Sequence, residues 1–232
     1  MNGKEKRAFT PLRFLTRLNR SVRKRLLHRK FGEEWNPQGA FQRRKYESYG
    51  AYLEHQKAKL ATHDFANYDT EFRTALRERL TALDVDWRDL TVLCLAARIG
   101  TEVKAFLDLG CRAIGIDLNP GKENRYVVQG DFHDLHFAPK SVDVVYTNSL
   151  DHAFDIDRIA SEVLKVLKPE GLLIVEAVQG RDQGVNPGFF ESLFWNNIDE
   201  LISVFETTGF KVTHRTPMTH PWPGEAICFR PA

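Results

Sequence analysis

Three features that mark specialised protein classes are missing from this chain of 232 residues. No stretch of about 18 uninterrupted apolar residues exists, so we expect no membrane-spanning helix. The chain has no apolar block near its start, so we expect no secretory signal. The few cysteines lack both a CxxC pair and metal-ligand spacing: Cys94, Cys111 and Cys228. All three lie inside apolar runs, which indicates buried, reduced thiols in a cytoplasmic protein.

A complete glycine-rich loop for a dinucleotide is also missing. Residues 91–103, TVLCLAARIGTEV, have the pattern of a strand, a loop and a helix, yet only Gly100 remains of the usual glycines, and Ala96 and Arg98 occupy two of their positions. The motif G-x-G-x-x-G lets the backbone approach a pyrophosphate, so its absence disfavours a nicotinamide-dependent oxidoreductase, which stays an alternative. No Ser/His/Asp or Cys/His triad signature is present either, which disfavours a nucleophile supplied by the protein.

The charged residues are divided unevenly along the chain. Residues 1–30 hold eleven basic side chains and one acidic, whereas the other residues hold 22 basic and 30 acidic. A stripe of apolar side chains recurs at steps of three and four within the basic segment: Leu12, Leu15, Leu18, Val22 and Leu26. The pattern predicts an amphipathic helix that contacts an anionic membrane surface. A nucleic-acid contact is less favoured, and a disordered or cleaved leader stays open.

Hydrophobic periodicity changes near residue 91. Before it, helical spacing predicts helices over residues 42–64 and 68–83, after a linker at 31–41. After it, short apolar runs predict strands at 91–95, 112–116, 125–128, 142–146 and 171–177, with helices near 100–109, 155–167 and 196–208. No helix fits between the last two strands, 210–216 and 224–230, so they should pair antiparallel. The segment between the second and third strands is too short for the usual crossover helix.

These elements predict an α/β fold with three parts. We expect a Rossmann-like, doubly wound, mostly parallel seven-stranded sheet with an antiparallel last strand, preceded by N-terminal helices. Residues 1–38 form the basic amphipathic arm and linker, residues 39–88 a helical cap, and residues 89–232 the sheet domain.

Polar side chains gather where the predicted strands end, which is where an open parallel sheet binds its ligands. Asp117 ends the second strand 21 positions after Ala96, a place suited to gripping a ribose diol with a carboxylate. The third strand ends in Gly130, Asp131 and Phe132, and a carboxylate beside an aromatic ring suits adenine. The fourth ends in a polar group: Asn148, Ser149, Asp151 and His152. The ligand should therefore resemble adenosine, without a pyrophosphate.

The chain has a family likeness over residues 90–178. Four stretches carry it, in this order: VLCLAARIGTEV, AIGIDLNPG, VVQGDFHDLHFAPKSVDVVYTNSLDHAFD and EVLKVLKPEGLLIVE. The chain resembles the class I S-adenosylmethionine-dependent methyltransferases, in the broad group around the ubiquinone- and menaquinone-type enzymes. The closing pair of strands also looks like the reversed seventh strand of that family. The resemblance implies S-adenosylmethionine as the cofactor.

The resemblance also implies a role for each residue at the strand ends. The loop 96–100 wraps the methionine part of the cofactor, Asp117 holds the ribose hydroxyls and Leu118 lies beside adenine. Asp131 and Phe132, which follow Gly130, bind adenine. Asn148 and Ser149 line the floor near the sulfonium.

Two departures from the family pattern concern charge. Cys94 stands where the family usually has an acid in the first strand, and Ala96 and Arg98 replace two of its glycines. We hypothesise that Glu102 replaces the missing acid and pairs with the cofactor's amino group. Equally, Glu102 can simply oppose the positive end of its helix. Arg98 would pair with the cofactor's carboxylate.

His152 and Asp151 are the candidate catalytic residues. The ordinary pKa of a histidine lies near neutrality, so His152 can serve as a general base towards the acceptor. It can instead cap or pack the next helix with Asp155. The stretch NSLDH is similar to the E-x-x-E-H metal site of some O-methyltransferases, but Asn148 replaces the first acid and is a weak ligand for a hard cation. We therefore expect no metal.

The function that these residues favour is methyl transfer from S-adenosylmethionine to a small-molecule acceptor by in-line displacement. Aromatic side chains near the expected acceptor site favour an apolar or aromatic acceptor: Phe189, Phe190, Phe194, Trp195, His220 and Trp222. A module that binds the cofactor or another adenosine ligand without turnover is the main alternative. The sequence leaves open the oligomeric state and whether oxygen, nitrogen or carbon is methylated.

Overall fold

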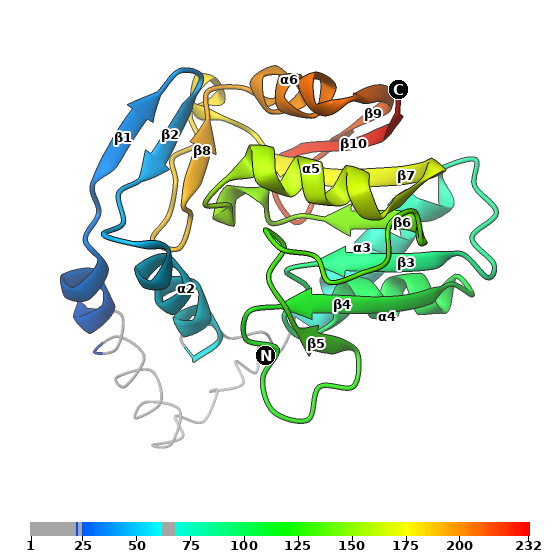
Figure 1. Ribbon diagram of the computed structural model, residues 1–232, viewed down its shortest axis with the longest axis horizontal. Helices are drawn as coiled ribbons and strands as arrows, with labels where there is room; N and C mark the ends of the chain where they lie inside the picture. Colours follow the sequence, from blue (N-terminus) through cyan, green and yellow to red (C-terminus); the bar gives the residue numbers. More distant parts are fainter. Residues whose placement is uncertain (1–21, 23–24, 62–67) are drawn as a thin grey trace, which may run out of the picture.

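A seven-stranded sheet forms the centre of the molecule in the computed structural model, which describes residue 22 and residues 25–61 and 68–232 (Figure 1). Its strand order is β5-β4-β3-β6-β7-β10-β9. Neighbouring strands from β5 to β7 are parallel, and β10 is antiparallel to both β7 and β9. The expected mostly parallel sheet with an antiparallel last strand is confirmed. The strands are β3 (Thr91–Leu95), β4 (Arg112–Asp117), β5 (Val127–Gln129), β6 (Val142–Thr147), β7 (Leu167–Val178), β9 (Phe210–Met218) and β10 (Gly224–Pro231).

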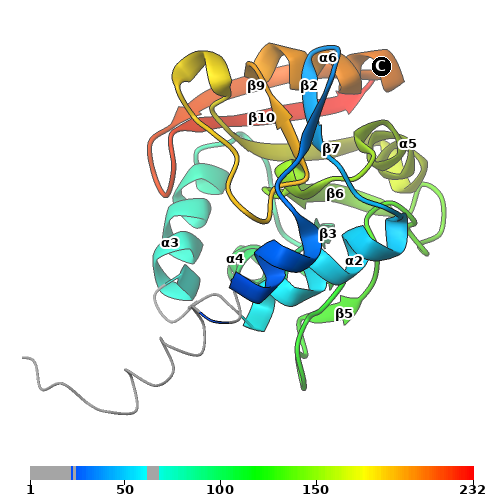
Figure 2. The ribbon, with the colours of Figure 1, turned by 90° about the vertical axis from the view of Figure 1, so that its left-hand side faces the viewer.

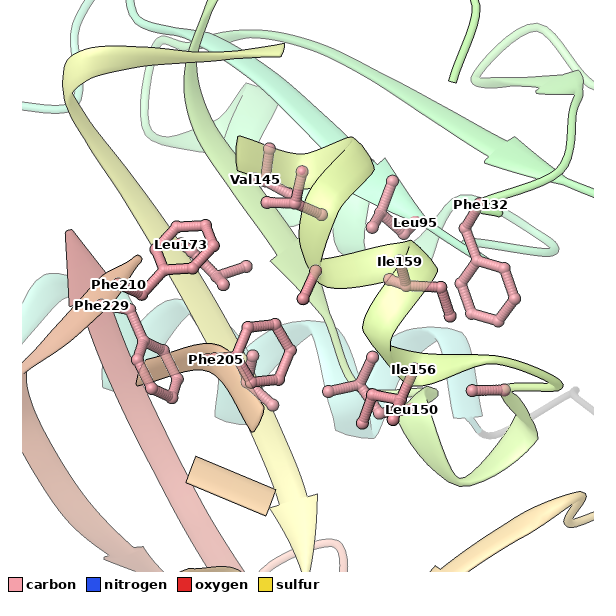
Figure 3. Close-up of a cluster of buried hydrophobic side chains, with 14 of the residues drawn as sticks. Leu95, Phe132, Val145, Leu150, Ile156, Ile159, Leu173, Phe205, Phe210 and Phe229 are labelled. Carbon is pink, nitrogen blue, oxygen red and sulfur yellow. The ribbon is translucent and has the colours of Figure 1, made fainter. Parts of the chain in front are cut away.

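Helices cover both faces of the sheet, as the doubly wound fold requires (Figure 2). Side chains alternate along each strand, so β3 sends Leu93 and Leu95 to one face, and Val92 and Cys94 to the other. The first face packs against α5 (Ile156–Val166) and α6 (Ile198–Thr208), and Figure 3 shows part of that core. The second face packs against α3 (Tyr68–Thr81) and α4 (Thr101–Asp108). All three cysteines are buried and unpaired.

The expected short link between the second and third strands is confirmed. Residues 118–126 contain no helix, and β4 pairs directly with β5 in parallel, with Gly115 opposite Val127. Because no crossover helix covers this end of the sheet, Ile114 and Val128 stay exposed. A loop without a crossover helix therefore joins β4 to β5 at this end of the sheet.

The predicted helix over residues 42–64 is wrong in its first part. Residues on either side of Gly39 form a hairpin of β1 (Trp35–Gln38) and β2 (Phe41–Arg44), and β8 (Leu193–Trp195) joins it in a three-stranded antiparallel sheet. The linker expected at 31–41 is thus partly strand, and the cap expected at 39–88 is not wholly helical. Pairing with a segment about 150 residues away overrode the local helical spacing.

The helix that follows is shorter than expected, α2 (Tyr49–Lys57), with a 3₁₀ turn η1 (Ala58–Ala61) after it. The Ser48 hydroxyl accepts a hydrogen bond from the amide of Ala51 and fixes the start of α2. Figure 1 shows α2 and the small sheet beyond the carboxyl ends of the central parallel strands. This placement lets α2 close the site described below.

Most of the apolar stripe in the basic arm, including Leu12, Leu15 and Leu18, lies outside the described residues. Residues 25–31 form a helical segment, and Leu26 on it is 58% exposed. Among the described residues, no helix is long and apolar enough to cross a membrane.

A buried ion pair joins α3 to the sheet. The Arg79 guanidinium donates to both carboxylate oxygens of Glu176 on β7, at 2.7 and 2.9 Å, and to the carbonyl of His220. The Glu176 side chain is 1% exposed. Because a buried carboxylate that loses its charged partner is strongly destabilised, this pair fixes α3 against the sheet.

We expect Arg79→Ala to lower the free energy of unfolding by about 3–5 kcal/mol, because Glu176 would stay buried without its counter-charge. Urea denaturation followed by circular dichroism measures the change. Arg88→Ala is the matched control, since Arg88 pairs with Asp86 on the surface, and its free energy of unfolding should equal that of the wild type. Equal losses in the two variants would contradict the role assigned to the buried pair.

Candidate active site

Two adjoining cavities lie where β3, β4, β5 and β6 end. The chain runs outward from β3 through β4 in one direction and through β6 in the other, so this is the point where strand order reverses. The first cavity holds about 40 Å³ and lies between α2 and the strand ends. The second holds about 400 Å³, and both are partly open to solvent. Ala96, Arg98 and His152 line both cavities, which therefore adjoin at these three residues.

The loop after β3 keeps the backbone shape of a glycine-rich loop without most of its glycines. Ala96 and Arg98 have φ angles of 53° and 41°, and Gly100 has 79°. Residues other than glycine rarely adopt this left-handed region, and each costs of order 1 kcal/mol or more. Gly100 itself cannot be replaced without a shift, since a Cβ there would lie 2.7 Å from Cβ of Tyr126. Such strain is typical of a functional loop.

Asp117 is held by the loop that it faces. Its Oδ2 accepts from the amide of Arg98 at 3.0 Å and its Oδ1 from the amide of Asn119 at 2.8 Å. Both bonds leave a lone pair on each oxygen. Asp117 lines the first cavity together with Leu118, Gly130 and Phe132. This arrangement agrees with the expected site for a ribose diol next to a planar base.

The carboxylate of Asp131 is engaged by neighbouring side chains. Its Oδ2 accepts from the hydroxyl of Tyr49 at 2.5 Å, and its Oδ1 accepts from both the amide and the Nδ1 of His133 at 2.9 Å. The carboxylate therefore ties α2 to the loop after β5, while the neighbours of Asp131 line the cavity. His133 accepts in turn from the amides of Phe154 and Asp155. Asp131 thus has a structural contact that the sequence did not predict, and its contact with adenine stays a prediction.

Glu102 is buried in the second cavity with half of its carboxylate unsatisfied. Its Oε1 accepts from Asn148 Nδ2 at 3.2 Å and from the Tyr68 hydroxyl at 3.3 Å. Its Oε2 is buried and has no hydrogen-bond partner within the described residues. Burial raises the pKa of Glu102 to about 7. Ser149 donates to Asn148 and completes the network. An orphaned carboxylate oxygen on a residue that lines a cavity is suited to receive a cationic ligand group.

His152 is buried and both of its ring nitrogens are engaged. Its Nδ1 donates to the carbonyl of Phe190 at 2.9 Å, which leaves Nε2 as the acceptor of a hydrogen bond from Lys59 Nζ at 2.5 Å. Burial, followed by the charges of Lys59 and Arg98, lowers the pKa of His152 well below its ordinary value. Because Lys59 Nζ already contacts the Nε2 of His152, the neutral imidazole ring is poorly placed to take a proton from an acceptor. The expectation that His152 is the general base is therefore not supported by its contacts, and its alternative partner Asp155 caps α5 without it.

Acidic groups surround this histidine. One oxygen or nitrogen atom from each of Asp151, His152 and Glu191 lies within 4.8 Å of the others. Burial, followed by the charge of Glu191, raises the pKa of Asp151. Lys59 places its ammonium against the same cluster. Sequence reasoning missed Lys59 and Glu191, because no local spacing links a 3₁₀ turn to a loop about 130 residues later.

A buried arginine holds the loop that carries Glu191. The Arg44 guanidinium on β2 donates to the carbonyls of Gly32, Gly188 and Glu191 at 2.8–3.2 Å. The small sheet, absent from the sequence prediction, thus positions one wall of the second cavity. Burial lowers the pKa of Arg44, but a guanidinium keeps its charge at neutral pH.

Some of the aromatic residues expected near the acceptor line the second cavity, and others do not. Phe194, Trp195 and Trp222 line the second cavity with Tyr68. Phe189 and Phe190 instead stack on His28 and His55, and His220 lies in a separate cavity beside Arg79. The second cavity therefore combines aromatic faces with the acidic cluster.

Comparison with known proteins identifies methyltransferases as the relatives of this chain. Residues 93–175 match the family described as "Methyltransferase domain". The chain is 30% identical over 128 residues to a probable S-adenosylmethionine-dependent methyltransferase of Mycolicibacterium smegmatis, covering 49% of each protein. It is 36% identical over 98 residues to demethylmenaquinone methyltransferase of Thermobifida fusca, covering 36% of this chain and 42% of the relative. The chain thus spans less than half the length of these curated relatives.

A solved structure shows the same fold at low identity. The 1,6-didemethyltoxoflavin-N1-methyltransferase of Burkholderia thailandensis, with 1,6-didemethyltoxoflavin and S-adenosylhomocysteine bound, has a TM-score of 0.61 and is 15% identical. The likeness covers 86% of this chain and 99% of that one.

The raised pKa of Glu102 predicts a pH-dependent stability. Between the ordinary value of 4.5 and about 7 the unfolded chain has lost the proton that the folded protein keeps. Stability from this group is therefore full below pH 4.5 and is lost as pH rises towards 7, by up to about 3 kcal/mol. Glu102→Gln should remove this loss, as measured by urea unfolding from pH 5 to pH 8. The exposed Glu206→Gln is the control and should follow the wild type; the same profile in both variants would contradict the assignment.

Proposed function

The chain contains a class I S-adenosylmethionine-dependent methyltransferase domain, and from this premise we propose that it transfers the cofactor's methyl group to a small-molecule acceptor in the second cavity. The observation that carries the proposal is the pair of adjoining cavities, with Asp117 lining one and Glu102, whose Oε2 has no partner within the described residues, lining the other. These two carboxylates match the two ends of the cofactor, a ribose diol and an ammonium group.

The residues of the cleft fit the cofactor along its length. Leu118, Gly130 and Phe132 would hold adenine, and Asp117 would accept from the ribose hydroxyls. Glu102 would receive the amino group, and Arg98 would approach the carboxylate. The loop from Ala96 to Gly100 would follow the methionine part, and Asn148 and Ser149 would form the floor near the sulfur. When bound, the cofactor supplies a methyl group on a cationic sulfur, ready for direct displacement.

The chain's own task is to position the acceptor and exclude water. Aromatic side chains from β8 and from the turn before β10 offer flat faces: Phe194, Trp195 and Trp222. The volume of the second cavity suits an acceptor of drug-like size. The Burkholderia neighbour with its bound heteroaromatic compound supports a small, aromatic acceptor. Tyr52 on α2 closes the first cavity and donates to the carbonyl of His152.

Cofactor binding should depend on the two carboxylates. We expect Asp117→Ala and Glu102→Gln each to weaken S-adenosylmethionine binding about 10- to 100-fold, because each removes charge-assisted hydrogen bonds. Isothermal titration calorimetry gives the affinities. Asp134→Asn, an exposed change in the loop after β5, should bind as the wild type does. Binding of NAD but of neither S-adenosylmethionine nor its demethylated product would contradict the proposal, whereas binding without transfer would favour the non-catalytic alternative.

We also propose that the protein is a cytoplasmic enzyme whose basic arm touches an anionic membrane surface. The exposed Val22 and Leu26 belong to the stripe that the sequence predicts for such a contact. The full chain should co-sediment with vesicles that contain anionic lipid and should dissociate at high salt, because the attraction is screened. Vesicles of neutral lipid are the control, and equal binding to both would contradict an electrostatic contact.

A further inference from the structure

We propose that Lys59 accepts the proton that a hydroxyl or N–H acceptor loses during methyl transfer, and that His152 positions Lys59 for this step. The inference rests on the proposed function and names its catalytic base. It replaces His152, the residue that the sequence favours, with one that the fold brings to the same place.

The contacts of His152 determine the geometry. The bond from Nδ1 to the Phe190 carbonyl fixes both the tautomer and the plane of the ring, so its lone pair on Nε2 points at Lys59. One N–H of Lys59 is thereby held on the histidine. The lone pair of a neutral Lys59 then points away from the ring. Lys59 and His152 line the second cavity, next to Asp151 and Glu191.

The charges around Lys59 come from four parts of the fold. Asp151 follows β6, Glu191 precedes β8, Arg98 lies in the loop after β3 and Asp117 ends β4. Burial, followed by the Arg98 guanidinium, lowers the pKa of Lys59, while the three carboxylates oppose that shift. The neutral amine is thus accessible near neutral pH, and the ammonium formed by proton uptake has carboxylates beside it.

The other groups of the cluster are less suited to take the proton. The Nε2 of His152 is covered by Lys59, and burial keeps this ring neutral. Burial, followed by the charge of Glu191, raises the pKa of Asp151 and favours its protonated form, which cannot take a proton. Its Oδ1 lies 3.8 Å from Nε2 of His152, and its charge raises the pKa of Lys59, so it is suited to balance the ammonium.

In the proposed step, the acceptor's O–H or N–H bond breaks, its proton joins the Lys59 nitrogen, and its electron pair stays on the acceptor atom. That atom bonds to the methyl carbon while the carbon–sulfur bond breaks, and the electrons of that bond stay on sulfur. The products are the methylated acceptor, a neutral thioether and the Lys59 ammonium. Solvent at the mouth of the cleft takes the proton afterwards.

The first test is independent of the acceptor. Pulse labelling of the full chain with acetic anhydride across pH 5–11, read by mass spectrometry, gives the titration midpoint of each lysine amine. Lys59 should label with a midpoint clearly below that of the exposed Lys211. His152→Phe removes the acceptor of the Lys59 hydrogen bond and should shift the Lys59 midpoint alone. Equal midpoints for Lys59 and Lys211 in the wild type would overturn the proposal.

The second test separates proton transfer from charge. Phenol keeps its proton at pH 7.5, whereas 4-nitrophenol is largely ionised. Lys59→Arg keeps the charge without a usable base, so transfer to phenol should fall about 100-fold or more, while transfer to 4-nitrophenol should fall far less. Ethylamine should partly restore Lys59→Ala with phenol. Full activity of Lys59→Arg with phenol would mean that Lys59 only balances charge.

Controls distinguish the failure of this inference from failure of the proposed function. Calorimetry with S-adenosylmethionine should give the same affinity for the wild type and both Lys59 variants, which also shows that they fold. A wild type that binds no cofactor contradicts the proposed function itself. A wild type that binds cofactor and methylates neither phenol contradicts a phenolic acceptor, and the labelling midpoints then decide the role of Lys59.

Discussion

The hydrogen bond from the Arg98 amide to the Asp117 carboxylate is the contact on which the rest of the site depends. It joins the ends of β3 and β4, two neighbouring strands at the point where strand order reverses. The loop that makes it runs through left-handed conformations that alanine and arginine adopt only at a cost. The packing of the central sheet offsets the conformational cost of this loop. From this loop, α4 begins and places Glu102 in the second cavity.

Charged side chains in and beside the second cavity contact polar or charged partners. Arg44 holds the carbonyls of the loop that carries Glu191, and Lys59 lies against His152 and Asp151. Each of these buried charges would be costly alone, since burial strongly favours the neutral form. Together they make a cluster whose protonation can change at modest cost. Such a cluster, next to aromatic faces, is the physical basis of the acid–base chemistry that we infer.

Much of the fold followed from periodicity. The alternation of apolar runs and helical spacing after residue 91 predicts every strand and helix of the central sheet, because β–α units bury alternate faces of each strand. Helical spacing failed at residues 42–44, because β2 pairs with β8 across a separation that no local pattern encodes. Asp117 and Glu102 were accessible to the sequence, since Asp117 ends β4 and Glu102 lies in the first turn of α4, just after the loop that follows β3. The sequence places Asp131 just after the third strand, as the structure does. Its contact with Tyr49, however, depends on how α2 packs.

The sequence by itself determined the order of strands and helices in the central sheet, the edge of that sheet where the two cavities lie, and the loss of glycines from the first loop. These properties depend on residues close together in the chain, whose spacing encodes which face is buried. Only the tertiary structure decided that Asp131 binds Tyr49, that His152 is covered, and that Lys59 and Glu191 share one cavity. Those contacts join segments 80 to 130 residues apart. Packing alone brings such segments together, so no local pattern carries the information.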